Sequence, residues 1–81
     1  MKEQVYQKIV AMLQEQKGKN FSPQLNSLLE NDIVADSVET MEFVLTLEDE
    51  FNLAIPDVAI EQFETLSDVV DFIWEESQKR S

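Results

Sequence analysis

Apolar residues recur at helical spacing through most of the 81-residue chain. In residues 3–16, four of them fall at i, i+4, i+7 and i+8, which is typical of an amphipathic helix: Val5, Ile9, Met12 and Leu13. Gly18 follows closely, and a glycine in this place commonly ends a helix. The pattern therefore predicts a first helix over residues 3–16.

A second helix is predicted from Asp36 to about Phe51. Asp36 can cap its N-terminus, since Glu39 stands three residues later. Apolar residues then follow at helical spacing: Met41, Val44, Leu45 and Leu47. The intervening residues 19–35 are irregular, and loops of more than about 12 residues usually have structure of their own. We therefore expect a helical turn near residues 26–30.

The last third of the chain predicts two more helices. Pro56 cannot continue a helix interior, and Asp57 can cap a short third helix over residues 58–63. Thr65 with Asp68 forms a capping box at the start of the last helix. Lys79 and Arg80 stand at its C-terminal end, where the helix dipole favours cations. No segment alternates long enough to predict a strand. The predicted fold class is all-α, a small four-helix bundle of three longer helices and one short helix.

Composition limits the chemistry. At 81 residues, with 43% apolar and 28% charged residues, the chain fits a single folded domain over residues 1–81. It contains no cysteine and no histidine, which excludes disulfides and the Ser-His-Asp and Cys-His pairs of hydrolytic enzymes. We expect no catalytic residues and no specific metal site. No apolar run approaches the roughly 18 residues that cross a bilayer, so we expect a soluble, cytoplasmic protein.

The net charge of −11 is unevenly distributed, because between Lys19 and Lys79 lie fifteen acidic residues and no Lys or Arg. Such a surface repels nucleic acid and anionic membranes and attracts basic protein patches. We therefore expect protein partners with basic patches, no nucleic-acid binding and no stable membrane insertion.

Ser37 is the candidate residue for chemistry. If Asp36 is the cap, Ser37 is the first helical residue, and its hydroxyl projects from a helix N-terminus that favours a phosphate. With no histidine to activate it, this serine fits an acceptor that another protein modifies better than it fits a nucleophile. On these two residues alone, a plain helix start is the simpler interpretation.

The surrounding residues change that preference. The segments "ADSVETMEFVLTLEDEF", "AIPD" and "TLSDVVDFI", within residues 30–74, resemble the acyl carrier protein family. The resemblance implies that Ser37 receives a 4′-phosphopantetheine arm from coenzyme A. It also implies that Asp36 helps to hold a metal ion while a phosphopantetheinyl transferase attaches the arm. The arm's thiol would then carry acyl groups as thioesters, most often in fatty acid synthesis.

The resemblance also assigns two groups of residues. Acidic side chains on the second helix would bind basic patches on acyl-handling enzymes: Glu39, Glu42, Glu48 and Asp49. Apolar side chains would line the interior that shelters the acyl chain: Leu47, Ile55, Ile60 and Phe63. Taken without the resemblance, these acids form a solvated helix face and these apolar residues form an ordinary core.

Several acids stand three or four residues apart in the sequence without a neighbouring cation: 39/42, 57/61, 61/64, 68/71 and 71/75. Each such pair costs about 0.2–0.5 kcal/mol. We expect this repulsion to be unrelieved, and to be kept because acidic surfaces speed association with basic partners.

Two residues depart from the usual family pattern. Val34 stands where a glycine is usual, and Val38 replaces a leucine. A β-branched residue does not readily adopt a positive φ, so if that glycine does, the loop before Ser37 must be shaped differently here.

Three other functions stay open at this stage. A D-alanyl carrier or a polyketide-type carrier would bear the same arm and differ in its cargo. A protein of another class, an acidic monomer that imitates nucleic acid and occupies a basic site, would leave Ser37 unmodified. For the carrier, too, we expect a monomer.

Overall fold

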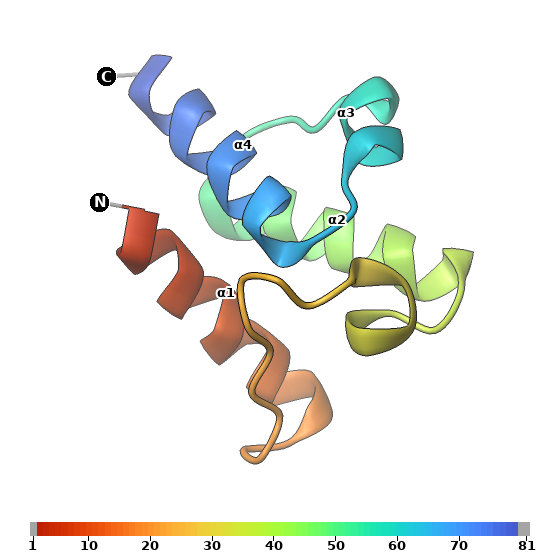
Figure 1. Cartoon of the computed structure of the whole chain (residues 1–81). Coiled ribbons are helices and arrows are strands. Elements are labelled where there is room, and N and C mark those ends of the chain that lie inside the picture. Colours follow the sequence, from red (N-terminus) through yellow and green to blue (C-terminus); the bar gives the residue numbers. More distant parts are fainter. Residues whose placement is uncertain (1, 80–81) are drawn as a thin grey trace.

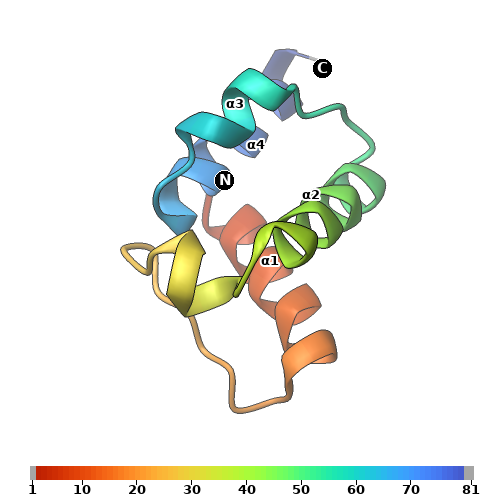
Figure 2. The same cartoon turned by 90° about the vertical axis from the view of Figure 1, so that its right-hand side faces the viewer.

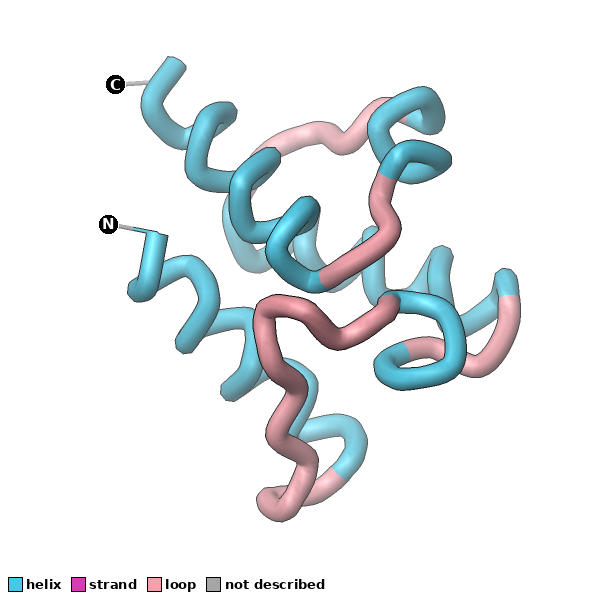
Figure 3. The backbone as a smooth tube through the Cα atoms, in the orientation of Figure 1, coloured by secondary structure: helices cyan, strands magenta, loops and turns pink. Residues whose placement is uncertain are grey.

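The computed structural model describes residues 2–79, and helices dominate them (Figures 1 and 3). The elements in chain order are α1 (Lys2–Lys17), the turn η1 (Leu29–Ile33), α2 (Ser37–Phe51), α3 (Asp57–Gln62) and α4 (Leu66–Lys79). Within η1 the backbone of Glu30 and Asn31 is not helical. No strand occurs within the described residues. The predicted all-α bundle of three longer helices and one short helix is confirmed.

One apolar cluster holds the bundle together. No polar or charged side chain is buried among the described residues. α1 and α4 pack against each other, and α2 closes the cluster from the other side (Figures 1 and 2). The buried members are Val5, Ile9, Met12, Leu13, Leu29, Ile33, Val34, Phe43, Val44, Leu47, Ile55, Leu66, Val69, Val70 and Ile73.

α1 ends where the sequence predicts. Gly18 has φ +109°, a conformation that favours glycine, and its N–H donates to the Gln14 carbonyl at 2.9 Å. Tyr6 of α1 donates its hydroxyl to the Pro23 carbonyl at 2.7 Å, which ties the following loop back onto the helix.

The helical turn predicted near residues 26–30 is wrong, because this part of the chain pairs with the segment before α4, and the turn η1 that follows is not helical at Glu30 and Asn31. The Leu66 N–H donates to the Ser27 carbonyl at 3.0 Å, and the Leu29 N–H donates to the Glu64 carbonyl at 3.0 Å. These bonds hold the loop extended next to the start of α4, so the turn forms afterwards, as η1.

The loop before Ser37 accommodates Val34 without a positive φ at that residue. Val34 is buried and extended, with φ −122°, and the positive φ of 81° lies at Asn31 instead. Asparagine tolerates this region far better than a β-branched residue does. The Asn31 N–H donates to the Val34 carbonyl at 3.0 Å, which closes the turn.

α2 begins and ends as predicted. Asp36 is its N-cap, and the Asp36 Oδ1 atom accepts the Glu39 N–H at 2.9 Å. Asn52, in the left-handed conformation, is the C-cap. Of the four apolar residues that mark the helical period, Val44 and Leu47 are buried, whereas Met41 and Leu45 are exposed.

α3 starts differently from the prediction that Asp57 caps it. Pro56 is the N-cap and has no side-chain hydrogen bond, and Asp57 is already the first helical residue. A proline fixes φ near the value that leads into a helix, so the chain enters α3 without a capping carboxylate. The helix ends at Gln62, and none of its residues is fully buried.

The start of α4 confirms one half of the predicted capping box. Asp68 Oδ2 accepts the Thr65 N–H at 3.1 Å and the Glu64 N–H at 2.9 Å. No bond from the Thr65 hydroxyl to the helix occurs in the described part of the chain. Lys79 lies in the last turn of α4 as expected, and Arg80 lies outside the described residues.

Candidate functional site

Ser37 is exposed at the first position of α2. The Asp36 side chain accepts the Glu39 N–H, and within residues 2–79 the N–H groups of Ser37 and Val38 find no acceptor. Such unsatisfied donors, together with the helix dipole, favour an anion. The Ser37 hydroxyl therefore stands beside groups that would stabilise a phosphate ester.

An open groove runs from Ser37 towards α3. One side consists of α2 with its cap, a second side is the turn before α2, and the third is α3 with the residue that follows it. Its lining residues are Glu30, Asn31, Val34, Ala35, Asp36, Ser37, Thr40, Met41, Ile60, Glu61 and Phe63. The hydroxyl thus opens onto a surface that is apolar along one wall and acidic at its rim.

The four residues predicted to shelter an acyl chain do not lie together on this groove. Ile60 and Phe63 line it and are half-buried. Leu47 and Ile55 belong to the buried core and line no groove with them. A sheltered acyl chain would have to pass the first pair to reach the second, so the four-residue pocket stays a prediction.

Glu39, one of the four acids predicted to bind partners, already has a cation beside it. Its Oε1 atom lies 3.3 Å from Lys17 Nζ and accepts the Ala35 N–H at 3.4 Å. The expected absence of a relieving cation is therefore wrong for Glu39, because folding brings α1 alongside the start of α2.

The same correction applies to Asp71, and Glu50, which is in none of the predicted pairs, also has a cation beside it. Lys2 Nζ lies 3.0 Å from Asp71, and Lys8 Nζ lies 3.6 Å from Glu50. The lysines of α1, distant in sequence, thus offset part of the repulsion in α2 and α4. Asp57, Glu61 and Glu64 have no ion pair within residues 2–79, but Glu64 lies beyond the end of α3, so of the two predicted pairs only 57/61 stands at helical spacing.

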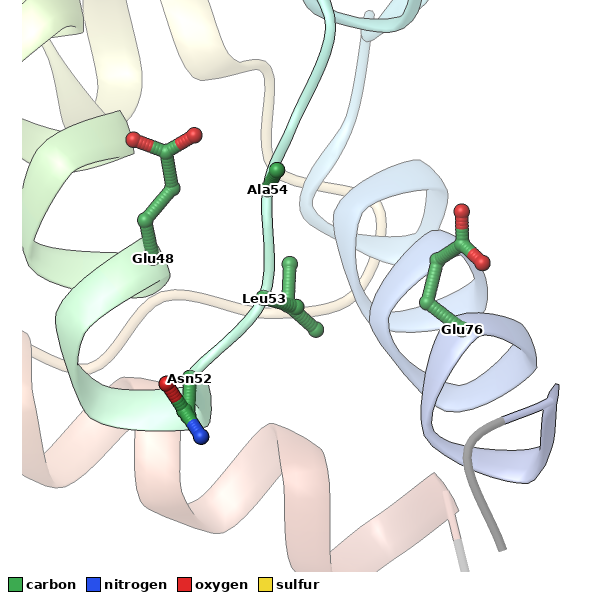
Figure 4. Close-up of a pocket in the computed structure, with 5 residues that line it drawn as sticks. All are labelled: Glu48, Asn52, Leu53, Ala54 and Glu76. Carbon is green, nitrogen blue, oxygen red and sulfur yellow. The ribbon is translucent and has the colours of Figure 1, made fainter.

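Glu48 has a contact that the sequence did not indicate. Its Oε2 atom accepts the Ile55 N–H at 2.8 Å, across the segment between α2 and α3. The side chain is half-buried and borders an open pocket, drawn in Figure 4, with Asn52, Leu53, Ala54 and Glu76. Glu48 is thus bound within the fold, unlike a freely solvated acid.

Glu42 and Asp49 are exposed, and neither has an ion pair within the described chain. They share one side of α2 with three exposed apolar residues: Val38 (64% exposed), Met41 (49%) and Leu45 (57%). We call these five residues the outer face of α2. The sequence analysis missed its apolar part because Met41 and Leu45 continue the helical period. A helical wheel places positions 38, 41, 42, 45 and 49 within one arc, which is the signal that could have found it.

A comparison with protein families gives this site its context. A family model described as acyl-carrier matches residues 3–81. The chain belongs to the acyl carrier protein family. It is 38% identical to the acyl carrier protein of Guillardia theta, over 88% of this chain and 89% of that protein. It is 35% identical to the acyl carrier protein of Cyanidioschyzon merolae, over 98% of this chain and 88% of that protein.

Solved structures of acyl carrier proteins share the fold. The crystal structure of the Thermotoga maritima protein superposes with a TM-score of 0.83 at 22% identity, over 99% of this chain and 94% of that one. The Enterococcus faecalis protein gives a TM-score of 0.63 at 38% identity, over 90% and 94% of the two chains. At 22% identity the first match supports the arrangement of helices alone.

Residues 2–79 contain neither a membrane-spanning helix nor a cluster of metal ligands. No helix there is long and apolar enough to cross a membrane. No three or more acidic side chains gather there in a way that would hold a metal ion.

Proposed function

We propose that this acyl carrier family member carries acyl intermediates of fatty acid synthesis as thioesters, on a 4′-phosphopantetheine arm attached to Ser37. The observation that carries the proposal is the exposed Ser37 hydroxyl on the first residue of α2. This alcohol stands beside helix N–H groups that have no acceptor within residues 2–79, and it opens onto a groove. The proposal treats residues 1–81 as one carrier domain that acts without catalysis of its own.

The residues around Ser37 fit such an arm. The N–H groups of Ser37 and Val38 would stabilise its phosphate, and the groove wall at Thr40, Met41 and Ile60 offers a mixed polar and apolar surface for the rest. When bound, the arm supplies the thiol on which acyl groups are held as thioesters. The chain itself contributes a fixed attachment point and an open surface.

Attachment of the arm requires a partner, because Ser37 has no base beside it. The Oδ1 atom of Asp36 accepts the Glu39 N–H, which fixes the carboxylate against the first turn. The Oδ2 atom has no partner within residues 2–79 and would be available to a metal ion that the transferase brings. In this proposal Asp36 orients the site, and the phosphopantetheinyl transferase supplies the base.

The outer face of α2 is the proposed contact surface for that transferase and for acyl-handling enzymes with basic patches. Glu42 and Asp49 supply negative charge for steering, and the exposed apolar side chains between them supply area to bury. Such a surface suits brief and repeated binding by a monomer. We place the protein in the cytoplasm, where these enzymes would meet it.

The test is the intact mass of the protein after incubation with coenzyme A and a phosphopantetheinyl transferase of broad specificity. The wild type should gain one arm, and Ser37→Ala should gain none while keeping its helicity. Ser22→Ala, which removes another exposed serine hydroxyl, is the matched control and should gain one arm. An arm on Ser37→Ala would overturn the site assignment, and a bare wild type would favour the acidic protein that imitates nucleic acid.

The cargo is a separate question, because D-alanyl and polyketide-type carriers bear the same arm. Incubating the armed protein with a malonyl-transferring enzyme, a D-alanine-activating enzyme and a polyketide-type loading enzyme, each in turn, distinguishes them. The fatty acid assignment predicts that the malonyl-transferring enzyme charges the arm fastest.

A further inference from the structure

α3 is the least firmly packed helix of the described chain. It has six residues, no side-chain cap and no fully buried residue, and only Ala59 and Ile60 are half-buried. Figures 1 and 2 show it set apart from α1, joined to α2 and α4 by extended segments. Because its own packing is slight, its position depends on how its two ends are held.

The C-terminal end of α3 is fixed to α4 in two ways. The rings of Phe63 and Phe72 meet edge to face, with centroids 5.7 Å apart. Asp68 Oδ2 accepts the N–H groups of Glu64 and Thr65 at 2.9 and 3.1 Å. These contacts fix where α3 ends and where the segment before α4 begins.

The N-terminal end is held by Glu48. Its Oε2 atom accepts the Ile55 N–H at 2.8 Å, immediately before Pro56, whose nitrogen has no hydrogen to donate. The Glu48 carbonyl also accepts the Leu53 N–H at 3.2 Å. Figure 4 shows Glu48 on α2 beside the segment that carries Leu53 and Ala54. Glu48 therefore accepts hydrogen bonds from both Leu53 and Ile55, in the segment that leads into α3.

Glu48 and Ser37 lie on the same flank of α2. They are eleven residues apart, which is about three turns or roughly 17 Å along the helix. α3 faces this flank, since Ile60, Glu61 and Phe63 line the groove onto which Ser37 opens. α3 thus lies between the bond of the Glu48 carboxylate at its N-terminal end and the groove that its own residues line.

We propose that Glu48 is a positioning residue for the Ser37 groove, whose carboxylate fixes the N-terminal end of α3 by holding the Ile55 N–H. The Glu48 carboxylate thus holds the segment before α3 in place, whereas the neighbouring Asp49 side chain is exposed to solvent. The inference rests on the proposed function only in that the groove is taken to receive the arm. The groove wall that α3 and Phe63 form is present in the unmodified chain.

The test uses the full chain with a bare Ser37, so its outcome is independent of arm attachment. Amide hydrogen exchange and methyl and ring signals are measured by NMR in the wild type, Glu48→Ala, Glu48→Gln and Asp49→Ala. In Glu48→Ala, exchange at Ile55 should rise by about tenfold to a hundredfold, and the signals of Ile60 and Phe63 should shift. Exchange at the buried Ile9 should change much less, which separates a local effect from global unfolding.

The other two variants separate the hydrogen bond from the charge. Glu48→Gln keeps an oxygen acceptor and should raise exchange at Ile55 by only about twofold to tenfold. Asp49→Ala makes the same charge change as Glu48→Ala and should leave Ile55, Ile60 and Phe63 as in the wild type. Unchanged Ile60 and Phe63 signals in Glu48→Ala, or equal effects of Asp49→Ala, would overturn the proposal. Should Glu48→Ala fail to fold, an unchanged Ile55 rate in Glu48→Gln would overturn it.

Discussion

Lys17 Nζ lies 3.3 Å from Glu39 Oε1, so the end of α1 brings a cation to the first turn of the helix that carries Ser37. Both side chains are partly exposed, 31% for Lys17 and 41% for Glu39, and a pair of this kind contributes at most about 1 kcal/mol to stability. Its main effect is on the charge that a partner meets. Glu39 is partly neutralised, whereas Glu42, one turn further on, is not.

Removing this cation should strengthen the attraction of basic partners. Lys17→Gln frees the Glu39 carboxylate and should raise the association rate constant with a phosphopantetheinyl transferase by about twofold to fivefold at low salt. Stopped-flow measurements over a range of ionic strength would give this rate constant. Lys19→Gln makes the same change in net charge, but Lys19 has no ion pair within residues 2–79, so its effect should be smaller. Equal rates for the two variants would mean that total charge alone matters.

Asp36 should have two separable roles, as a helix cap and in arm attachment. Asp36→Ala removes the bond to the Glu39 N–H and should lower the free energy of unfolding by about 1 kcal/mol. Asp36→Asn keeps a capping oxygen and should change stability by only a few tenths of a kcal/mol. Urea unfolding of both variants gives these values.

The same pair of variants tests the proposed role in the transferase complex. Because a neutral amide binds a metal ion poorly, Asp36→Asn should accept the arm about tenfold more slowly or worse, although its cap is intact. Intact mass followed over time gives the rate. If Asp36→Asn gains the arm as fast as the wild type, Asp36 is a helix cap and nothing more.

Glu42 lies at the centre of the outer face of α2, where its charge should steer partners. Glu42→Lys should slow transfer from the armed protein to acyl-handling enzymes mainly through association, by about tenfold at low salt, with little loss of stability. Glu15→Lys makes the same charge change on an exposed position of α1 and should slow transfer less. Comparing kcat/KM for both variants at low and high salt measures the difference. Unchanged kinetics for Glu42→Lys at low salt would remove this face from the proposed interface.

Local signals in the sequence predicted the parts of the fold that local chemistry determines. Gly18 ends α1 and Asp36 starts α2 as expected, because a left-handed C-terminus and a capping carboxylate involve only residues within one turn. Asp57 was misassigned as a cap because Pro56 leads the chain into α3, which makes Asp57 the first helical residue. The position of Ser37, the proposed attachment residue, at the start of α2 followed from the cap next to it.

Contacts between distant segments could not be predicted from local signals in the sequence. The bond from Ile55 to Glu48 and the ion pair of Lys17 with Glu39 depend on how the helices are arranged in space. The same holds for Leu45, whose spacing fits a buried helix face although the bundle leaves it exposed. Without the packing, a sequence shows which side chains are acidic but not which of them are already bound.

Repulsion around α3 should make stability depend on ionic strength. The chain has a net charge of −11, and Glu61 stands four residues after Asp57 and three before Glu64, with no ion pair to any of them in the described residues. Raising NaCl from low concentration, or adding millimolar magnesium, should therefore raise the melting temperature, which circular dichroism would follow.

A single substitution tests whether this repulsion is local. Glu61→Gln removes the like-charge pair with Asp57 within α3 and should stabilise the protein at low salt by about 0.2–0.5 kcal/mol, and salt should then raise its melting temperature less than that of the wild type. Glu15→Gln removes the same charge from α1, where no acid stands three or four residues away in the sequence, and should give no such gain. A melting temperature indifferent to salt in the wild type, or an equal gain from both variants, would show that the acids around α3 carry no particular strain. The slight packing of α3 makes it the helix on which such a gain should be largest.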